Sequence, residues 1–374
     1  MSSKAILWVE IEELGELVAY LKRSQCLLKE ATGAVHREHF RTTYLTSIDR
    51  SSILRLITMF EQTKQFHRVP VGFGPAPSPR QDPTGKRFDW SQSLTTTVGI
   101  VVECDRAAVQ AILPEAYTVK PPSFTPSDKA NVLFEIMELR NLPWLAGRGY
   151  NTWGVYISDV VCHRAKKDDG SLYKGSYLAV LFESFTDPIT TGREELGFPK
   201  VWAELPDGSV SDGGKSRVHT AGWFGYEFLR LEIRGLKEHD PATAPALTRP
   251  ADGFTHPSQH GFLHHRYVPA VGEPGKADAS YATFNPAPPG KAPVKRFWAP
   301  FPSPGRSRPS EDVSVAVTGP EIEFKITPGT FEQLPTLHNV VKGLADLRPG
   351  KVLEAAIQEI KGASDLLANH RIEK

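Results

Sequence analysis

Residues 183–200 read Glu-Ser-Phe-Thr-Asp-Pro-Ile-Thr-Thr-Gly-Arg-Glu-Glu-Leu-Gly-Phe-Pro-Lys, and the rest of the chain is interpreted around them. The apolar run 177–182 directly before them predicts a buried strand. Thr190 or Thr191 can cap a short helical turn, with acidic residues near its positive end. Gly197 then ends the turn. The stretch therefore predicts a strand, one helical turn and a second extended segment.

The second extended segment begins with a lysine in an apolar setting. Pro199 forces the preceding Phe198 into an extended conformation, and Lys200 follows beside Val201 and Trp202. A lysine amine is a nucleophile only when it is neutral, and burial among apolar groups favours the neutral form. A neutral buried lysine can attack a ketone and form a Schiff base. The alternative is an ordinary surface lysine that follows a proline turn.

The motif that contains this lysine also occurs in a known family. Gly192-Arg193-Glu194, followed by Gly197-Phe198-Pro199-Lys200, resembles the signature of the acetoacetate decarboxylase superfamily. Acetoacetate decarboxylase is itself a known example of an enzyme with a lysine activated in this way. The similarity covers roughly residues 68–365. The further segments that carry it are 101–115, 134–137, 262–269 and 334–335. The resemblance implies that Lys200 is the Schiff-base residue, inside a closed antiparallel β-barrel.

Composition excludes several other classes of protein. The chain has 374 residues, 40% of them apolar, and a net charge of +1, so no overall field attracts nucleic acid or an anionic membrane. Its three cysteines are widely spaced and fit a reducing compartment. No apolar run reaches the length of a membrane helix, and glutamates interrupt the apolar N-terminal stretch. We expect a soluble, cytoplasmic protein with no nucleic-acid or membrane partner.

The pattern divides the chain into two parts. Residues 1–66 predict a helical N-terminal extension, in which apolar residues from Leu7 to Leu21 recur at heptad spacing. That helix can pack on the domain or form a subunit contact. Residues 67–374 form the acetoacetate decarboxylase-like domain. The resemblance also implies a homo-oligomer.

Inside the domain, the periodicity predicts mainly strands, with helices near the ends, and hence the α+β class. Helices are expected at 106–113, 337–347 and 351–360, and a long proline- and glycine-rich surface loop at 269–309. The expected strands are 95–102, 132–137, 152–161, 177–182, 229–233, 314–317 and 322–326.

Three charged residues are candidates for catalytic roles beside Lys200. Glu135 lies on a strand that faces the active site in the family that the chain resembles. It can act as a general acid or base, or it can be a structural carboxylate. Arg193 can bind a substrate carboxylate, although neutralising a neighbouring glutamate is the stronger interpretation. Glu194 has the same two possible roles.

The chain departs from the decarboxylases that it resembles at three positions. Val201 replaces a second lysine, Thr152 replaces a glutamate, and Thr95–Thr97 stands where an arginine begins a strand, with Arg87 the nearest substitute. Without the second cation, burial alone must lower the pKa of Lys200. These changes indicate a substrate bulkier than acetoacetate. We expect the substrate to contact four residues, namely Thr152, Trp153, Phe198 and His265.

Histidine 265 enters this set because the run 264–266 lies in a predicted strand and turns one imidazole inward. His256, His260 and His264 have helical spacing, but Pro257 and Gly261 argue against a helix, so we expect no metal. No phosphate loop or dinucleotide motif is present, and we expect no cofactor.

The sequence therefore predicts a cofactor-free carbon–carbon lyase. It would act through a Schiff base on Lys200 on a keto acid or related carbonyl compound, and decarboxylation is the first expectation. One alternative is Schiff-base aldolase, dehydratase or cyclase chemistry. The other is a catalytically silent barrel that binds a small molecule.

Overall fold

The structure is a computed structural model that describes residues 65–70, 74–121, 126–238, 261–286, 294–299, 315–319 and 322–373. The predicted helical extension therefore lies outside the described residues, apart from residues 65 and 66. No helix in the described ranges is long and apolar enough to cross a membrane.

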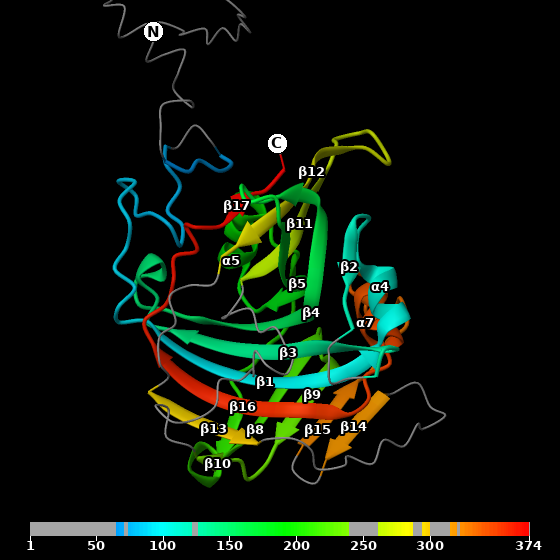
Figure 1. Ribbon diagram of the computed structural model, residues 1–374. Helices are drawn as coiled ribbons and strands as arrows, with labels where there is room; N and C mark the ends of the chain where they lie inside the picture. The colour runs from blue at the N-terminus through cyan, green and yellow to red at the C-terminus, as the bar shows by residue number, and fades with distance from the viewer. Residues whose placement is uncertain are drawn as a thin grey trace, which may run out of the picture. The chain divides into compact units, whose positions relative to one another are not determined.

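A large curved sheet dominates the described part of the chain (Figure 1). Its strands follow the order β10-β13-β16-β1-β3-β4-β5-β11-β12-β17, while β2 pairs with β4 and β6 pairs with β5. The strands are β1 (Leu94–Asp105), β2 (Tyr117–Val119), β3 (Lys129–Arg140), β4 (Tyr150–Lys166), β5 (Leu172–Glu183), β6 (Lys200–Trp202), β10 (Lys237–Glu238), β11 (Phe262–Pro269), β12 (Ala277–Asn285), β13 (Lys295–Ala299), β16 (Val352–Lys361) and β17 (His370–Arg371).

A second, smaller sheet has the order β14-β15-β9-β8-β7. Its strands are β7 (Ser209–Ser211), β8 (Ser216–Trp223), β9 (Tyr226–Ile233), β14 (Val315–Gly319) and β15 (Ile322–Ile326). On β9 the apolar side chains at 229, 231 and 233 are buried, while Arg230 and Glu232 between them are half-buried. Apolar and polar positions therefore alternate along β9, and the strand predicted at 229–233 is confirmed.

The helical segments are short. They are α4 (Arg106–Ile112), α5 (Thr186–Thr191), α7 (His338–Asp346), the 3-10 turns η2 (Pro143–Leu145) and η4 (Asp212–Gly214), and a π-helical turn η3 (Gly192–Leu196). Helix α4 begins where the Asp105 side chain accepts a hydrogen bond from the Ala108 backbone N–H. Helices α4 and α7 match the predicted positions to within a few residues.

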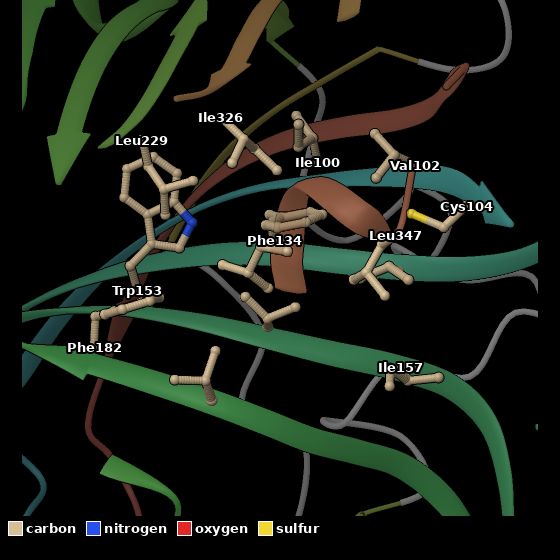
Figure 2. Packing of buried hydrophobic residues seen from close by; sticks show 14 of the residues in the cluster. Ile100, Val102, Cys104, Phe134, Trp153, Ile157, Phe182, Leu229, Ile326 and Leu347 are labelled. Carbon is tan, nitrogen blue, oxygen red and sulfur yellow. The ribbon is translucent and has the colours of Figure 1, made fainter. Parts of the chain in front are cut away.

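The core fills the space between the two sheets (Figure 2). Phe134 on β3 packs against Phe324 on β15 with ring centroids 4.6 Å apart, and the Phe182 ring on β5 lies 5.3 Å from the Phe228 ring on β9. Trp153 is fully buried in the same cluster. Burying each such aromatic side chain contributes roughly 1.5–3 kcal/mol to stability, so this layer helps to hold the two sheets together.

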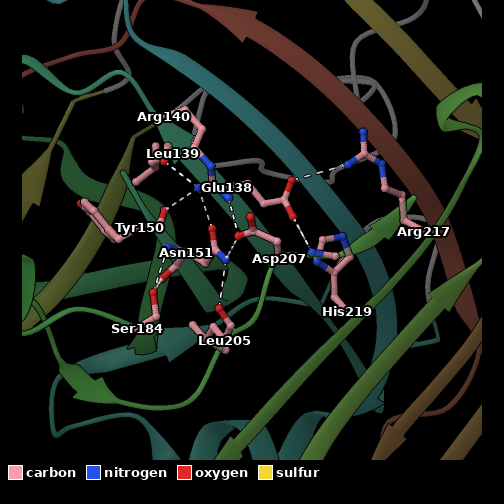
Figure 3. A network of polar contacts seen from close by, with 11 residues as sticks. Glu138, Leu139, Arg140, Tyr150, Asn151, Ser184, Leu205, Asp207, Arg217 and His219 are labelled. Atoms are coloured by element: carbon pink, nitrogen blue, oxygen red, sulfur yellow. Dashed lines mark hydrogen bonds and ion pairs between the residues drawn. The ribbon is translucent and has the colours of Figure 1, made fainter. Parts of the chain in front are cut away.

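A polar network beside this core links the two sheets (Figure 3). Glu138 on β3 accepts a hydrogen bond from the Gly208 N–H at 2.7 Å and lies 3.5 Å from the Arg217 guanidinium on β8. His219 packs against Gly208, where a Cβ would approach its ring to 2.2 Å. Burial lowers the pKa of His219 to about 4, so the ring is neutral at pH 7. The network is structural and contains none of the predicted site residues.

Three fold predictions are wrong. The large sheet is not closed into a barrel in the described residues: β10 and β17 are its edges, and β5 forms parallel pairs with both β6 and β11. The segment predicted as a helix at 351–360 is strand β16, because it pairs with β1 on one side and with β13 on the other. The strand is buried on both faces and lacks the alternation of apolar and polar residues that would have indicated it. Part of the predicted loop 269–309 forms β12 and β13. Proline and glycine residues on either side of these two strands led to the loop prediction.

Candidate active site

Lys200 begins strand β6, directly after the π-helical turn. Gly197 ends that turn with a φ of 73°, a conformation that favours glycine. The Phe198 N–H then donates to the Gly192 carbonyl at 3.0 Å, and Lys200 pairs with Leu181 in the parallel β5·β6 ladder. The local prediction around Gly197 and Lys200 is confirmed. Thr191 stands at the N-cap position of η3, as predicted, but its side chain does not cap the turn, because its hydroxyl donates to the Asp187 carbonyl.

The Lys200 side chain is buried and has a charged partner. It is 6% exposed, and its Nζ lies 2.7 Å from Oε1 of Glu183, which is 1% exposed. The amine also donates to the Pro188 carbonyl at 2.9 Å and lies 5.5 Å from the centre of the Phe198 ring. Phe198 is thus the predicted apolar neighbour. The buried charged partner Glu183 was not predicted from the sequence.

Gly192 makes room for the lysine. A Cβ at this position would lie 2.3 Å from Cε and 2.6 Å from Nζ of Lys200. Such distances are far below van der Waals contact, so any side chain at Gly192 must move the lysine. The turn therefore sets the path of the lysine through both the backbone of Gly197 and the missing side chain of Gly192.

Burial also changes the acidity of Glu183. It raises the pKa of this carboxyl, and the neighbouring Lys200 only partly offsets that effect. The second oxygen, Oε2, has no hydrogen-bond partner among the described residues. A carboxyl with a raised pKa at 2.7 Å can take a proton from the ammonium group and leave two neutral groups. The pair can therefore supply a neutral amine without any change in its net charge.

Strand register places Glu135 in the same row of the sheet as Lys200. Glu135 pairs with Gly154, Gly154 with Leu181, and Leu181 with Lys200. Residues directly opposite each other in a ladder point to the same face, so Glu135 and Lys200 share this face. Glu135 is 8% exposed. The same face carries an apolar cluster formed by Val101, Leu133, Tyr156, Leu178, Leu181, Leu196, Phe198 and Leu353.

The four predicted substrate contacts fall in different places. Thr152 is directly opposite Glu183 in the β4·β5 ladder, is buried, and its hydroxyl has no hydrogen-bond partner among the described residues. Phe198 contacts the lysine. Trp153 lies on the other face of β4, in the core between the sheets, because neighbouring strand residues alternate in direction.

The fourth predicted contact, His265, is half-buried, and its Nε2 lies 3.1 Å from the Ser280 hydroxyl. Its neighbour His264 is the inward imidazole: it is fully buried, its Nε2 donates to the Leu196 carbonyl, and its ring centre lies 4.5 Å from that of Phe198. Burial lowers the pKa of His264 to about 3. The strand prediction was right, but it assigned the wrong histidine. His256 and His260 lie outside the described residues.

The predicted charged residues of the turn lie on its outer side. The side chains of Arg193 and Glu194 are both exposed, which gives no support to a role at the buried amine. The neighbouring Glu195 pairs instead with Arg68 at 3.1 Å. Arg87, the suggested substitute for a family arginine, is exposed and pairs with Asp365 at 2.6 Å.

Sequence reasoning missed Glu183, Gly192 and Tyr156 as site residues. A signal for Glu183 was available, because a carboxylate that ends a long apolar strand must find a buried partner. Tyr156 belongs to the apolar cluster beside Lys200. Its strand was predicted, but the face of the strand to which its side chain points was not.

Comparisons with known proteins bear on this site. The family model for acetoacetate decarboxylase (ADC) matches residues 69–295. Among curated proteins, none matches the chain. One similar solved structure is acetoacetate decarboxylase from Legionella pneumophila, with 15% identity, coverage of 81% of this chain and 98% of its own, and a TM-score of 0.45.

Two other solved structures are enzymes described by other names. An acetoacetate decarboxylase-like enzyme from Sphingomonas wittichii RW1 has 17% identity, covers 77% of this chain and 95% of its own, and has a TM-score of 0.41. The enduracididine biosynthesis enzyme MppR, complexed with pyruvate, has 11% identity, covers 80% and 98%, and has a TM-score of 0.43. The match to the family model spans more than half of the sequence, and the chain therefore belongs to the acetoacetate decarboxylase family.

Proposed function

We propose that the protein is a cofactor-free carbon–carbon lyase that forms a Schiff base between Lys200 and the carbonyl carbon of its substrate. The observation that carries this proposal is the buried pair of Lys200 and Glu183, with 2.7 Å between amine nitrogen and carboxyl oxygen. Burying two opposite charges costs free energy that their attraction repays only in part. A function for the pair explains why the fold keeps it.

Schiff-base formation follows from the proton that this pair shares. Glu183 takes a proton from the Lys200 ammonium, and the nitrogen lone pair then forms a bond to the carbonyl carbon while the C=O π electrons move to oxygen. Glu183 returns this proton to the oxygen, then takes a second proton from the nitrogen and passes it to the same oxygen, which leaves as water. Two of the ammonium protons depart with that oxygen as water, and the iminium nitrogen keeps the third. Glu183 is again a carboxylate, now beside a cationic iminium.

Decarboxylation is the reaction that we propose after this step. In the iminium of a β-keto acid, the bond to the carboxylate breaks, and its electron pair forms the C=C bond of an enamine as nitrogen accepts the C=N electrons. Carbon dioxide leaves as a neutral molecule. The enamine carbon then takes a proton, and water releases the ketone and the free lysine. Glu135 is in the row of Lys200 and is our candidate for the proton transfer to carbon.

The surroundings of the lysine support this reaction. The apolar cluster on the same face disfavours a bound carboxylate, and the Glu135 and Glu183 carboxyls add like charge when they are ionised. Losing carbon dioxide removes that unfavourable charge. The apolar cluster also agrees with a substrate larger and more apolar than acetoacetate.

The position of Glu183 offers a reason why Thr152 is tolerated. The decarboxylases that the sequence resembles carry a glutamate where this chain has Thr152, and Glu183 is the residue directly opposite Thr152 in the β4·β5 ladder. Residues directly opposite in such a ladder have Cβ atoms about 4.5–5.5 Å apart. We infer that the carboxylate has moved to the neighbouring strand while staying at the same place in the site.

A second reaction class uses the same intermediate. An iminium on Lys200 also acidifies the carbon beside it, so a base at Glu135 can form the enamine without loss of carbon dioxide. Aldol, dehydration or cyclisation chemistry then follows. Glu135 on the substrate face of β3 is the observation that keeps this candidate. A silent binding protein fits less well, because binding alone requires no buried lysine–carboxylate pair.

The test is to incubate the protein with β-keto acids, α-keto acids and simple ketones of increasing size, and to measure evolved carbon dioxide and released products. We expect carbon dioxide from a β-keto acid larger than acetoacetate, and a loss of roughly a thousandfold or more in Lys200→Ala. The variant Lys174→Ala removes an exposed lysine of β5 and serves as the control. Product formation without carbon dioxide would favour the aldol class. Equal rates in wild type and Lys200→Ala would overturn the Schiff-base proposal.

A further inference from the structure

Tyr156 on β4 holds its ring over a glycine in the row of the active site. A Cβ at Gly154 would lie 2.6 Å from a ring carbon of Tyr156 and 3.1 Å from its hydroxyl oxygen. The hydroxyl therefore occupies the space above Gly154 that any other residue would fill. The β4·β5 register shifts between Val155 and Tyr156, and such irregularities redirect a side chain. This shift accounts for a ring that turns back towards Gly154.

The place above Gly154 lies between the charged groups of the site. Gly154 pairs with Glu135 on one side and with Leu181 on the other, and Leu181 pairs with Lys200. The Tyr156 ring belongs to the apolar cluster that also contains Leu181 and Phe198. Glu135 and Lys200 therefore stand on either side of the place that the hydroxyl occupies.

The surroundings keep this phenol protonated. Burial raises the pKa of Tyr156 well above its ordinary value, and the nearby carboxyls of Glu135 and Glu183 raise it further. A phenol in this setting does not release its proton at neutral pH. It remains a hydrogen-bond donor, and it is not suited to act as a base.

We propose that Tyr156 is a catalytic residue that donates a hydrogen bond to the carbonyl oxygen of the substrate while Lys200 attacks the carbonyl carbon. This inference rests on the proposed Schiff-base function. During the attack the π electrons of the carbonyl group move to its oxygen, and a fixed donor in a dry site stabilises that developing charge. The two protons that leave with the oxygen as water originate from the Lys200 ammonium and are passed on by Glu183, so Tyr156 keeps its own proton throughout. Gly154 has a supporting role, because it leaves the space for the ring.

The main test removes only the hydroxyl. In Tyr156→Phe we expect the rate of borohydride-trapped adduct formation to fall roughly a hundredfold, the loss typical of one donor to a developing oxyanion. The matched control is Tyr177→Phe, a buried tyrosine of β5 that packs in the core 5.2 Å from Tyr117. The control should form the adduct at the wild-type rate. Circular dichroism and urea unfolding of both variants establish that each is folded.

A spectroscopic measurement separates hydrogen bonding from a purely structural role. In Lys200→Ala, a bound ketone labelled with ¹³C at its carbonyl cannot form the adduct. Its C=O stretch should shift to lower frequency than in water-free solvent. Adding Tyr156→Phe to that variant should abolish the shift. An unchanged stretch in the double variant would contradict the proposal.

The outcomes are distinguishable. If wild type forms the Lys200 adduct and Tyr156→Phe forms it equally fast, the role of Tyr156 is overturned and the Schiff-base function stands. If wild type traps no carbonyl compound at all, the proposed function fails, and the role of Tyr156 fails with it. A hundredfold loss in Tyr156→Phe together with an unchanged Tyr177→Phe supports the proposal.

Discussion

The two faces of the large sheet differ although the same strands build them. On β3, β4 and β5, an aromatic residue that faces the smaller sheet stands next to a polar residue that faces Lys200. The three pairs are Phe134–Glu135, Thr152–Trp153 and Phe182–Glu183. All six residues are buried. The core face gains stability from close packing, whereas buried polar groups on the other face reduce stability, and this contrast is why we propose the second face as the functional one.

The first prediction concerns the core member of one pair. Phe182→Ala removes a fully buried ring that packs 5.3 Å from Phe228. We expect the free energy of unfolding to fall by about 3–5 kcal/mol, since a cavity replaces the ring. Urea unfolding measures this loss. Adduct formation per folded molecule should stay at the wild-type rate, and a large rate loss in folded Phe182→Ala would show that the two faces are not separable.

The second prediction concerns its neighbour in the sequence. Glu183→Gln keeps the shape of the side chain but removes the group that exchanges a proton with Lys200. The rate of adduct formation should fall roughly a hundredfold, the usual effect of losing a general acid–base group. Samples quenched with borohydride at a series of times measure the rate of adduct formation. Glu138→Gln, a carboxylate in the polar network on the core side, is the control and should keep the rate.

The third prediction uses pH and the histidine beside Phe198. Burial lowers the pKa of His264 to about 3, so the folded protein binds this proton far less readily than the unfolded chain, whose histidine has its ordinary pKa near 6.5. Stability is therefore lost as the pH falls below 6.5. This one group should cost about 2 kcal/mol between pH 7 and pH 5.

The check is urea unfolding of wild type and His264→Phe at both pH values. The variant loses the hydrogen bond to the Leu196 carbonyl at either pH, so the informative quantity is the change between the two. We expect the loss in free energy of unfolding between pH 7 and pH 5 to be smaller in His264→Phe by about 2 kcal/mol. Equal pH dependence in the two proteins would mean that His264 is not held neutral by the fold.

The fourth and smallest prediction concerns the path of the lysine. A methyl group at Gly192 would lie 2.3 Å from Cε of Lys200, so Gly192→Ala must displace the amine from Glu183. We expect a loss of about tenfold in the rate of adduct formation, the size expected for a small misplacement of a reacting group. Gly343→Ala in helix α7, where no atom lies within 4 Å of the added methyl group, is the control. A wild-type rate in Gly192→Ala would show that the lysine adjusts without loss.

The backbone conformation around Lys200 was predictable from the sequence, because it depends on residues that are close together in the chain. Gly197, Pro199 and the apolar run before Glu183 determine how Lys200 enters its strand, and all of them act within a few residues. The strand β16 was not predictable, because its apolar residues at 353, 356, 357 and 360 have the spacing of a helix, and only the pairing with β1 makes this segment a strand. The open sheet likewise depends on which strands pair at its edges.

The site required strand register that the sequence does not display. Glu183 and Lys200 are 17 positions apart, and only the parallel β5·β6 pairing brings them into contact. The choice between His264 and His265 depends on a step of one residue, which reverses the face of a strand. The same step places Trp153 in the core and Thr152 beside Glu183.

The central claim is that Lys200 is a nucleophile because of where the fold places it. The direct measurement is peptide mass mapping of the adduct trapped by borohydride with an apolar β-keto acid or ketone. We expect modification of the peptide that contains Lys200 when the ligand is present at less than one equivalent, and no modification of this peptide in Lys200→Ala. Modification spread over exposed lysines such as Lys174, or unchanged in Lys200→Ala, would contradict the claim.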